Sequence, residues 1–342
     1  MQRRARLTKD TIIKIVGIAV AILLFFSILL VVTDRIKKKA TSSTPSSSLV
    51  LDPYEDEEID PVSYFFGKAY THKKNLEAVL FMGIDSYGET QEVEGNRNHD
   101  QVDVLMLCVI DHSKKTYQVL QINRDTFTKI PKIGATGDRL GMETAQIALS
   151  HTYGSGLKDS CEYTAEAVSY LLLGEEVKHY IALKLDSIAI LNKSVGGVEV
   201  TVPVDMTVVD PAMKKGEKIL LTDKQAEYFV RSRQILEDDT NVSRMQRQDT
   251  YLHAWRIKAK QKLSEDASFA LDLIADLSYY MVADQDLNGL SNLSGYLADY
   301  EYLGMLKIDG KTKPGKDFRE FYPNEDSLKQ AVMTLFYDEK AQ

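Results

Sequence analysis

The sequence contains few of the residues that most often build metal centres and nucleophilic sites. It has two cysteines and six scattered histidines in 342 residues. It has no CxxC, HExxH or zinc-ligand spacing, and no serine in a nucleophile elbow. A histidine-bound metal or a catalytic triad therefore has no support. The two thiols, Cys108 and Cys161, fit either two buried cysteines or one disulfide.

Positive charges are fewer than negative charges. The chain has 42 lysines and arginines against 50 aspartates and glutamates, a net charge of −8. The region around the N-terminal apolar run carries a surplus of seven positive charges, so the remainder is near −15. An acidic domain repels nucleic acid and anionic headgroups. A phosphorylated ligand would therefore need a local cluster of arginines.

The one long apolar run lies near the N-terminus. Residues 15–32 are apolar except for Gly17 and Ser27. At 1.5 Å per residue, such a helix crosses a hydrocarbon core of about 30 Å. No small-residue cleavage site follows, so we expect an uncleaved transmembrane anchor over residues 11–33. The balance of basic residues slightly favours a cytoplasmic position for residues 1–10.

A low-complexity stretch follows this anchor. Residues 40–48 form a Ser/Thr/Pro tract and residues 52–60 are acidic, so neither can bury enough apolar surface to fold. We therefore predict a largely disordered stalk over residues 34–75. A folded extracytoplasmic domain is expected over residues 76–338. With the single anchor at residues 11–33, we expect a single-pass protein of the cell membrane.

Two apolar runs, Val102–Ile110 and Tyr117–Ile122, flank a polar turn and predict a β-hairpin in the middle of a covered sheet. The start of one antiparallel strand lies near the end of its partner. Asp103 should therefore converge with Arg124 and Asp125 at one sheet edge. Such a group suits a phosphate and its metal ion, and it equally suits a structural ion pair.

Strands and helices alternate through the rest of the chain. Further strands are predicted at 77–82, 179–183, 198–202 and 302–308. Helices are predicted at 143–153, 161–173, 187–194, 222–229, 241–262, 267–281 and 327–336. Thr222 and Gln225 form a capping box for one of these helices. The alternation predicts an α/β fold, an α-β-α layered domain with a central mixed sheet.

More charged residues stand at the ends of predicted elements. Asp85 follows an apolar strand, where ligands of α/β sheets often bind and where an aspartate also stabilises turns. If the chain is extended after residue 228, Arg231 and Arg233 point the same way and can share an anion. As an alternative, they are two solvated surface arginines.

Arg244 and Arg247 lie three residues apart, in the first turns of a predicted helix. Arginine is unfavourable near a helix N-terminus unless an anion is bound there. Carboxylates and arginines at element ends, without a histidine base, fit phosphoryl transfer, in which positioning and charge stabilisation supply most of the catalysis.

Seven segments together resemble the LytR-CpsA-Psr family of cell-wall phosphotransferases. They occur in the order and spacing of that family and span about residues 79–252. The segments are FMGID (81–85), QVDVLML (101–107), INRDT (122–126), SHTYGSG (150–156), GGVEV (196–200), YFVRSR (228–233) and DDTNVSRMQRQ (238–248).

The resemblance implies an enzyme that takes a glycan from a polyprenyl-pyrophosphate carrier. It would transfer the glycan phosphate to a peptidoglycan hydroxyl and release polyprenyl phosphate. The glycan would be a teichoic acid, a capsule or another wall polysaccharide, and the lipid would lie in an apolar tunnel under the sheet.

The same resemblance assigns roles to individual residues. Asp85 and Asp103 would bind Mg²⁺ or Mn²⁺. The pyrophosphate would be bound by Arg124, Arg231 and Arg233, with Arg244, Arg247 and Gln248 completing the pocket. Asp125 would orient Arg124, and Asp239 occupies another acidic position of the family.

The chain departs from the family pattern at a few positions. Gln101 stands where the family has an arginine, for which Arg97 is a nearby replacement, Gln146 stands where a lysine is usual, and Asn241 stands where an aspartate is common. Two other functions stay open. A pyrophosphatase would use the same site with water as nucleophile, and a non-catalytic lipid-binding regulator would retain the arginines without metal dependence.

Overall fold

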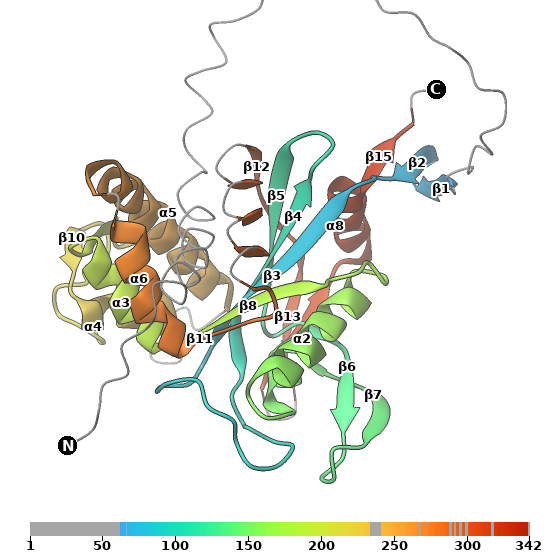
Figure 1. The fold of residues 1–342 in the computed structure, drawn as a ribbon, viewed down its shortest axis with the longest axis horizontal. Coiled ribbons are helices and arrows are strands. Elements are labelled where there is room, and N and C mark those ends of the chain that lie inside the picture. Colours follow the sequence, from blue (N-terminus) through green and yellow to red (C-terminus); the bar gives the residue numbers. More distant parts are fainter. Residues whose placement is uncertain are drawn as a thin grey trace, which may run out of the picture.

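The computed structural model describes residues 62–65, 67–232, 241–266, 268–286, 289–290, 292–293, 296–297, 300–315 and 318–340 (Figure 1). The predicted anchor at residues 11–33 lies outside these ranges. Within them, no helix combines the length and hydropathy that a membrane crossing requires.

The folded domain begins earlier than predicted. Residues Val62–Phe65 (β1) pair with Lys68–His72 (β2), which pairs with the C-terminal strand Tyr337–Glu339 (β15). This part of the chain was predicted to belong to a disordered stalk, and that prediction is wrong here. Pairing with a strand 265 or more residues away satisfies its backbone, which local composition could not reveal.

A six-stranded mixed sheet forms the centre of the domain, as predicted. Its order is β11 (Met281–Ala283), β8 (His179–Lys184), β3 (Leu76–Ile84), β4 (Val102–Asp111), β5 (Thr116–Ile122) and β12 (Glu301–Lys307). The β3–β8 and β5–β12 pairs are parallel, and the other pairs are antiparallel. The predicted hairpin is β4–β5, and β4 is covered on both faces.

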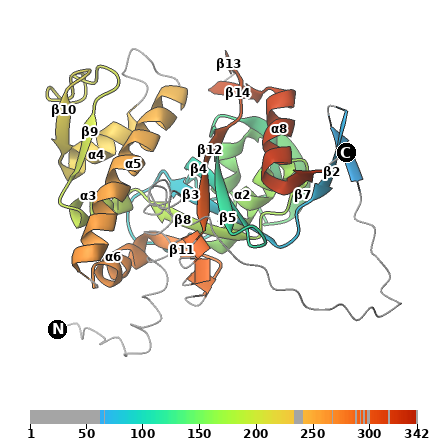
Figure 2. The ribbon, with the colours of Figure 1, turned by 90° about the horizontal axis from the view of Figure 1, so that it is seen from above.

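Helices cover both faces of this sheet (Figure 2). One face packs against α2 (Lys158–Leu171) and α8 (Glu325–Phe336). The opposite face packs against Leu252 of α5 (Asn241–Glu265) and three buried leucines, Leu290, Leu293 and Leu297.

Beside the sheet, α5 belongs to a second core around the buried Trp255. The other elements of this core are α3 (Asp186–Ser194), β9 (Val198–Thr201), β10 (Lys218–Leu221), α4 (Asp223–Arg231) and α6 (Phe269–Leu277). The predicted capping box of α4 is present.

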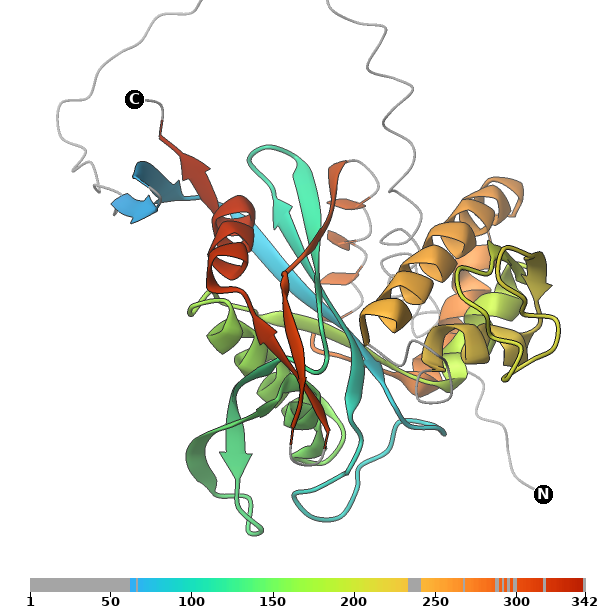
Figure 3. The ribbon, with the colours of Figure 1, turned by 180° about the vertical axis from the view of Figure 1, so that it is seen from behind.

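Two predicted helices are wrong in part. Residues 143–146 belong to β7 (Arg139–Gln146), which pairs with β6 (Phe127–Ile133) in a hairpin beside α2 (Figure 3). Only the 3₁₀ helix η3 (Ile147–Thr152) follows. The helix predicted to reach residue 281 ends at Leu277, and a 3₁₀ turn, η4 (Ser278–Tyr280), leads into β11.

Cross-strand hydrogen bonds outweighed the helical pattern in both segments. Residues 143–146 pair with the preceding strand β6, and residue 281 pairs with β8, which is distant in sequence. The hairpin of β13 (Gly310–Pro314) and β14 (Arg319–Pro323) was not predicted at all. Cys108 and Cys161 are buried free thiols and form no disulfide.

Candidate active site

Asp103 lies on a bulge at the start of β4. Gly83 pairs with Val104 and the next residue, Ile84, pairs with Val102, so Asp103 is the extra residue between them. Such bulges redirect a side chain and are common beside functional sites. A Cβ on Gly83 would lie 3.0 Å from Cβ of Val104, so this close pairing favours glycine.

The bulge brings two carboxylates to one edge of the sheet. The backbone N–H of Asp85, just after β3, donates to the carbonyl of Gln101, just before β4, at 2.8 Å. Asp85 therefore lies beside the start of β4, because its hydrogen-bond partner Gln101 is two residues before Asp103. The side chain of Asp85 is one-third exposed, whereas that of Asp103 is 13% exposed. The two predicted carboxylates thus differ in their environment.

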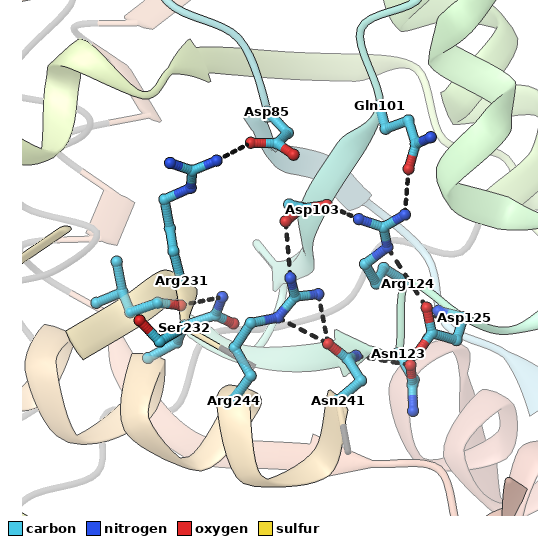
Figure 4. A network of polar contacts seen from close by, with 12 residues as sticks. Asp85, Gln101, Asp103, Asn123, Arg124, Asp125, Arg231, Ser232, Asn241 and Arg244 are labelled. Carbon is cyan, nitrogen blue, oxygen red and sulfur yellow. Dashed lines mark hydrogen bonds and ion pairs between the residues drawn. The ribbon is translucent and has the colours of Figure 1, made fainter. Parts of the chain in front are cut away.

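Asp103 accepts hydrogen bonds from two buried arginines (Figure 4). Nη1 of Arg124 donates to Oδ1, and Nη1 of Arg244 donates to Oδ2 at 2.7 Å. The arginine side chains are 9% and 4% exposed, so little water screens these pairs. The predicted convergence of Asp103 with the residues after β5 is confirmed.

Two asparagines fix the position of Arg244. Oδ1 of Asn241 accepts from Nε of Arg244 at 2.9 Å, and Nδ2 of Asn241 donates to Oδ1 of Asn123 at 2.7 Å. Asn123 in turn accepts from the backbone N–H of Asp125 at 2.9 Å. Asn241, one of the departures from the family pattern, therefore connects α5 to the turn that carries Arg124.

Arg124 also contacts Asp125 and Gln101. Its Nε lies 3.5 Å from Oδ1 of Asp125, which supports the predicted orienting role, and its Nη2 donates to Oε1 of Gln101. Gln146 donates to Asp125 at 3.3 Å. Arg97 lies 3.9 Å from the ring centroid of Tyr153, where its guanidinium makes a cation–π contact. Gln101 itself therefore occupies a place in the network, as a neutral partner of Arg124.

Arg231 is the last residue of α4, so the chain is helical here and the extended conformation considered in the sequence analysis does not apply at this residue. Its Nη2 donates to Oδ1 of Asp85 at 2.6 Å, and its Nη1 donates to Oε1 of Glu227, one helical turn earlier, at 2.6 Å and to the Tyr87 hydroxyl at 3.0 Å. Burial opposes the charge of Arg231, but the bond to Glu227 and the charge of Asp85 raise its pKa overall.

Sequence reasoning missed Glu227 and Tyr87. The (i, i+4) spacing of Glu227 and Arg231 would have indicated the pair if the helix predicted over residues 222–229 had been extended to Arg231. The Tyr87 hydroxyl donates to Glu227, and burial together with this bond raises its pKa to about 12. No pattern in the sequence connects Tyr87 to α4.

Arg247 and Gln248 hold the end of α4. Arg247 is fully buried and donates to the carbonyls of Phe229 and Ser232, and Gln248 donates to that of Val230 at 3.2 Å. These carbonyls belong to the last turn of a helix, where cationic side chains are favourable. Both residues thus hold the end of the helix that carries Arg231. Arg233 and Asp239, also predicted for the site, lie outside the described residues.

An apolar cavity of about 140 Å³ opens between the sheet and the helices beside these residues. Asp103, Arg231 and Gln248 belong to its lining. Most other lining residues are apolar, and they come from β3, β4, β8, α3 and α5, including Phe81, Met106, Ile181, Leu183, Ile188, Leu191 and Leu252. The cavity therefore combines a charged part with a hydrocarbon-like part.

The donor set for a metal is small. Among the described residues, no three His, Cys, Asp or Glu side chains gather around a point that could hold an ion. Asp85 and Asp103 supply hard carboxylate oxygens, and Mg²⁺ is commonly bound by one or two carboxylates together with substrate phosphates and water. The pair fits a site of that type, in which the protein supplies only some of the ligands of the ion.

The sequence model of the LytR_cpsA_psr family matches residues 32–336. The teichoic acid transferase TagV of Bacillus subtilis is 28% identical over 57% of this chain and 49% of its own length. The teichoic acid transferase TagU of Bacillus mycoides is 24% identical over 76% of this chain and 77% of its own length. The chain spans only 61% and 49% of the first two curated relatives that it matches.

Solved structures share the fold. The crystal structure of B. subtilis TagV superposes with a TM-score of 0.56 at 23% identity, covering 77% of this chain and 96% of TagV. The mixed sheet with helices on both faces is therefore common to both chains.

Proposed function

Because the chain belongs to the LytR_cpsA_psr family, we propose that it is a membrane-anchored phosphotransferase of the cell envelope. It would move a glycan phosphate from a polyprenyl-pyrophosphate carrier to a peptidoglycan hydroxyl and release polyprenyl phosphate. The relatives TagV and TagU carry names that state polyisoprenyl-teichoic acid and peptidoglycan as substrates. In this proposal the N-terminus is cytoplasmic and the catalytic domain is extracytoplasmic.

The observation that carries the proposal is the position of three arginines beside a largely apolar cavity. Arg231 lines the cavity itself, and Arg124 and Arg244 donate to Asp103, which also lines it. These arginines come from three separate elements. Guanidinium groups bind phosphate oxygens in bidentate geometry, and an apolar cavity suits a prenyl chain. A molecule that carries both groups, a prenyl diphosphate, matches the site as a whole.

In the proposed reaction the arginines neutralise the charge that develops on the phosphoryl oxygens, while the acceptor hydroxyl attacks in line. Asp103 holds Arg124 and Arg244 before the substrate arrives, and Asp85 together with Glu227 holds Arg231. Either Asp85 or Asp103 accepts the proton of the attacking hydroxyl. Arg247 and Gln248 act indirectly, by fixing the end of α4.

Asp85 and Asp103 are the residues that would hold a Mg²⁺ or Mn²⁺ ion. Bound there, the ion would neutralise diphosphate charge and favour departure of the prenyl phosphate. Asp85 is the more accessible of the two, because both oxygens of Asp103 accept hydrogen bonds from arginines.

The test uses the full-length protein in detergent with a lipid-linked glycan and peptidoglycan, and it measures released polyprenyl phosphate. Arg231→Ala should lower the rate by about 10³, the typical contribution of a transition-state arginine. Arg139→Ala is the matched control, because Arg139 is 52% exposed on β7 and pairs with Glu166. An unchanged rate in Arg231→Ala would refute the site assignment.

The same assay separates the other two functions. Release of free glycan phosphate without any acceptor would indicate a pyrophosphatase. Binding of the lipid without turnover, with or without Mg²⁺, would indicate a regulator.

A further inference from the structure

One aromatic side chain beside the arginines has no part in the proposed reaction. Tyr87 is 57% exposed, yet its hydroxyl donates to Glu227 and accepts from Nη1 of Arg231 at 3.0 Å. Single exposed aromatic residues are common on protein surfaces and carry no function by themselves. This one differs because its polar tip is bonded to the residues that hold Arg231.

The backbone around Tyr87 is fixed on both sides. The carbonyl of Ser86 accepts from the N–H of Leu185 at 3.0 Å, and the N–H of Gly88 donates to Oδ2 of Asp186 at 2.7 Å. The ring is thus held through its hydroxyl and through both neighbouring residues. A preorganised aromatic ring loses little conformational entropy when a ligand packs against it.

The position of Tyr87 follows from its contacts. Arg231 lines the apolar cavity, and its guanidinium carbon lies 5.6 Å from the ring centroid of Tyr87. Tyr87 is not among the described residues that line the cavity. Arg231 therefore lies between the cavity and Tyr87, and Tyr87 lies on the solvent side of Arg231.

We propose that Tyr87 is the stacking platform for the first sugar of the donor, the one esterified to the diphosphate. This inference rests on the proposed function. If the prenyl chain occupies the cavity and the diphosphate contacts Arg231, the group on the outer phosphate lies on the side of Tyr87. The C–H groups on one face of a sugar ring are positively polarised and pack against the negative face of an aromatic ring.

Glu227 and Arg231 also fix the orientation of the ring. The Tyr87 hydroxyl donates to Glu227 and accepts from Nη1 of Arg231, so its polar tip is held while 57% of the residue stays exposed.

The experiment compares two probes on the full-length protein in detergent by calorimetry. One is geranylgeranyl diphosphate, and the other is the same lipid with N-acetylglucosamine on its outer phosphate. The variants are Tyr87→Phe and Tyr87→Ala. Both lose the hydroxyl and its contact with Arg231, so the difference between them isolates the ring.

We expect the wild type and Tyr87→Phe to prefer the sugar-bearing probe. Tyr87→Ala should lose about two- to thirteenfold of that preference, as follows from 0.5–1.5 kcal/mol for an aromatic contact. Equal preferences in Tyr87→Phe and Tyr87→Ala would refute the stacking role of the Tyr87 ring, and they would leave the proposed function intact.

Two further outcomes separate the remaining explanations. An unchanged donor preference, together with a raised KM for peptidoglycan in Tyr87→Ala alone, would assign the ring to the acceptor and overturn the donor subsite. If the wild type bound neither prenyl probe, the proposed function would fail together with this inference.

Discussion

The two ends of the central sheet are both lined by ion pairs, but the cations differ. At the end where β4 begins, Asp103 and Asp85 pair with arginines. At the opposite end, where β4 finishes, His112 lies 3.0 Å from Glu77, and His179, at the start of β8, lies 2.7 Å from Asp284. Arginine keeps its charge at any physiological pH, whereas histidine titrates near neutrality.

This difference separates function from stability. The proposed diphosphate site needs cations that keep their charge over the whole physiological pH range, and arginine supplies them. The histidine pairs at the far end connect β3, β4 and β8 to neighbouring segments. The cavity of about 320 Å³ beside Glu77 and His179 has a mixed lining that includes Glu175, Glu176 and Lys178, in contrast to the largely apolar cavity at the arginine end. We therefore expect substitutions that remove a charge to have their largest effects at the arginine end. At the histidine end, we expect the free energy of unfolding to depend on pH.

The largest effect is expected for Asp103→Asn. This change leaves Arg124 and Arg244 buried without their carboxylate, and breaking a buried pair in this way costs about 3–5 kcal/mol. Asp85→Asn, at a pair that is one-third exposed, should cost about 1 kcal/mol or less. Urea unfolding of the two variants measures both values. Equal losses would mean that burial does not distinguish the two carboxylates.

Much of this arginine end could be predicted from sequence. The hairpin, the meeting of Asp103 with Arg124 and the mixed sheet all follow from apolar runs and antiparallel geometry, and these features are confirmed. Local patterns are sufficient where neighbouring elements in sequence are neighbours in space.

The remainder depends on contacts between distant residues. The bulge at Asp103 depends on the register of β3 against β4, and the helical end of α4 depends on Arg247 and Gln248 from α5. Tyr87 and Glu227 lie 140 residues apart and meet only in the fold. Such side-chain contacts have no periodicity in sequence, so propensity arguments could not find them.

An intermediate effect is expected for Glu227→Gln, which removes the charge that holds Nη1 of Arg231 while keeping a similar shape. A mispositioned arginine should lower kcat by roughly tenfold, since small displacements in a site cost up to about 10². Turnover of lipid-linked glycan at saturating substrate measures this loss.

Glu199→Gln is the control for this variant, because Glu199 on β9 has an exposed side chain and pairs with Lys218 on β10. Glu227→Asp should restore part of kcat, because it returns the charge. A kcat that is unchanged in Glu227→Gln would show that Asp85 alone positions Arg231.

The smallest effect is expected at the histidine end. A hydrogen bond to Asp284 raises the pKa of His179 above its ordinary 6.5, with Glu77 also raising it and burial and Lys178 opposing. The pKa of Asp284 is lowered, because the bonds from His179 and the Tyr180 N–H outweigh burial. The stabilisation from His179 is therefore complete below pH 6.5 and is lost as the pH rises through the higher folded value.

His179→Asn should therefore flatten the fall in unfolding free energy between pH 6 and pH 9, by less than about 1 kcal/mol, the range of partly exposed pairs. Urea unfolding across this pH range measures the change. His253→Asn, at an exposed position on α5, should leave the wild-type curve unaltered. If His179→Asn kept the full pH dependence, the pH sensitivity would lie elsewhere, and the contrast between the two ends of the sheet would lose its thermodynamic basis.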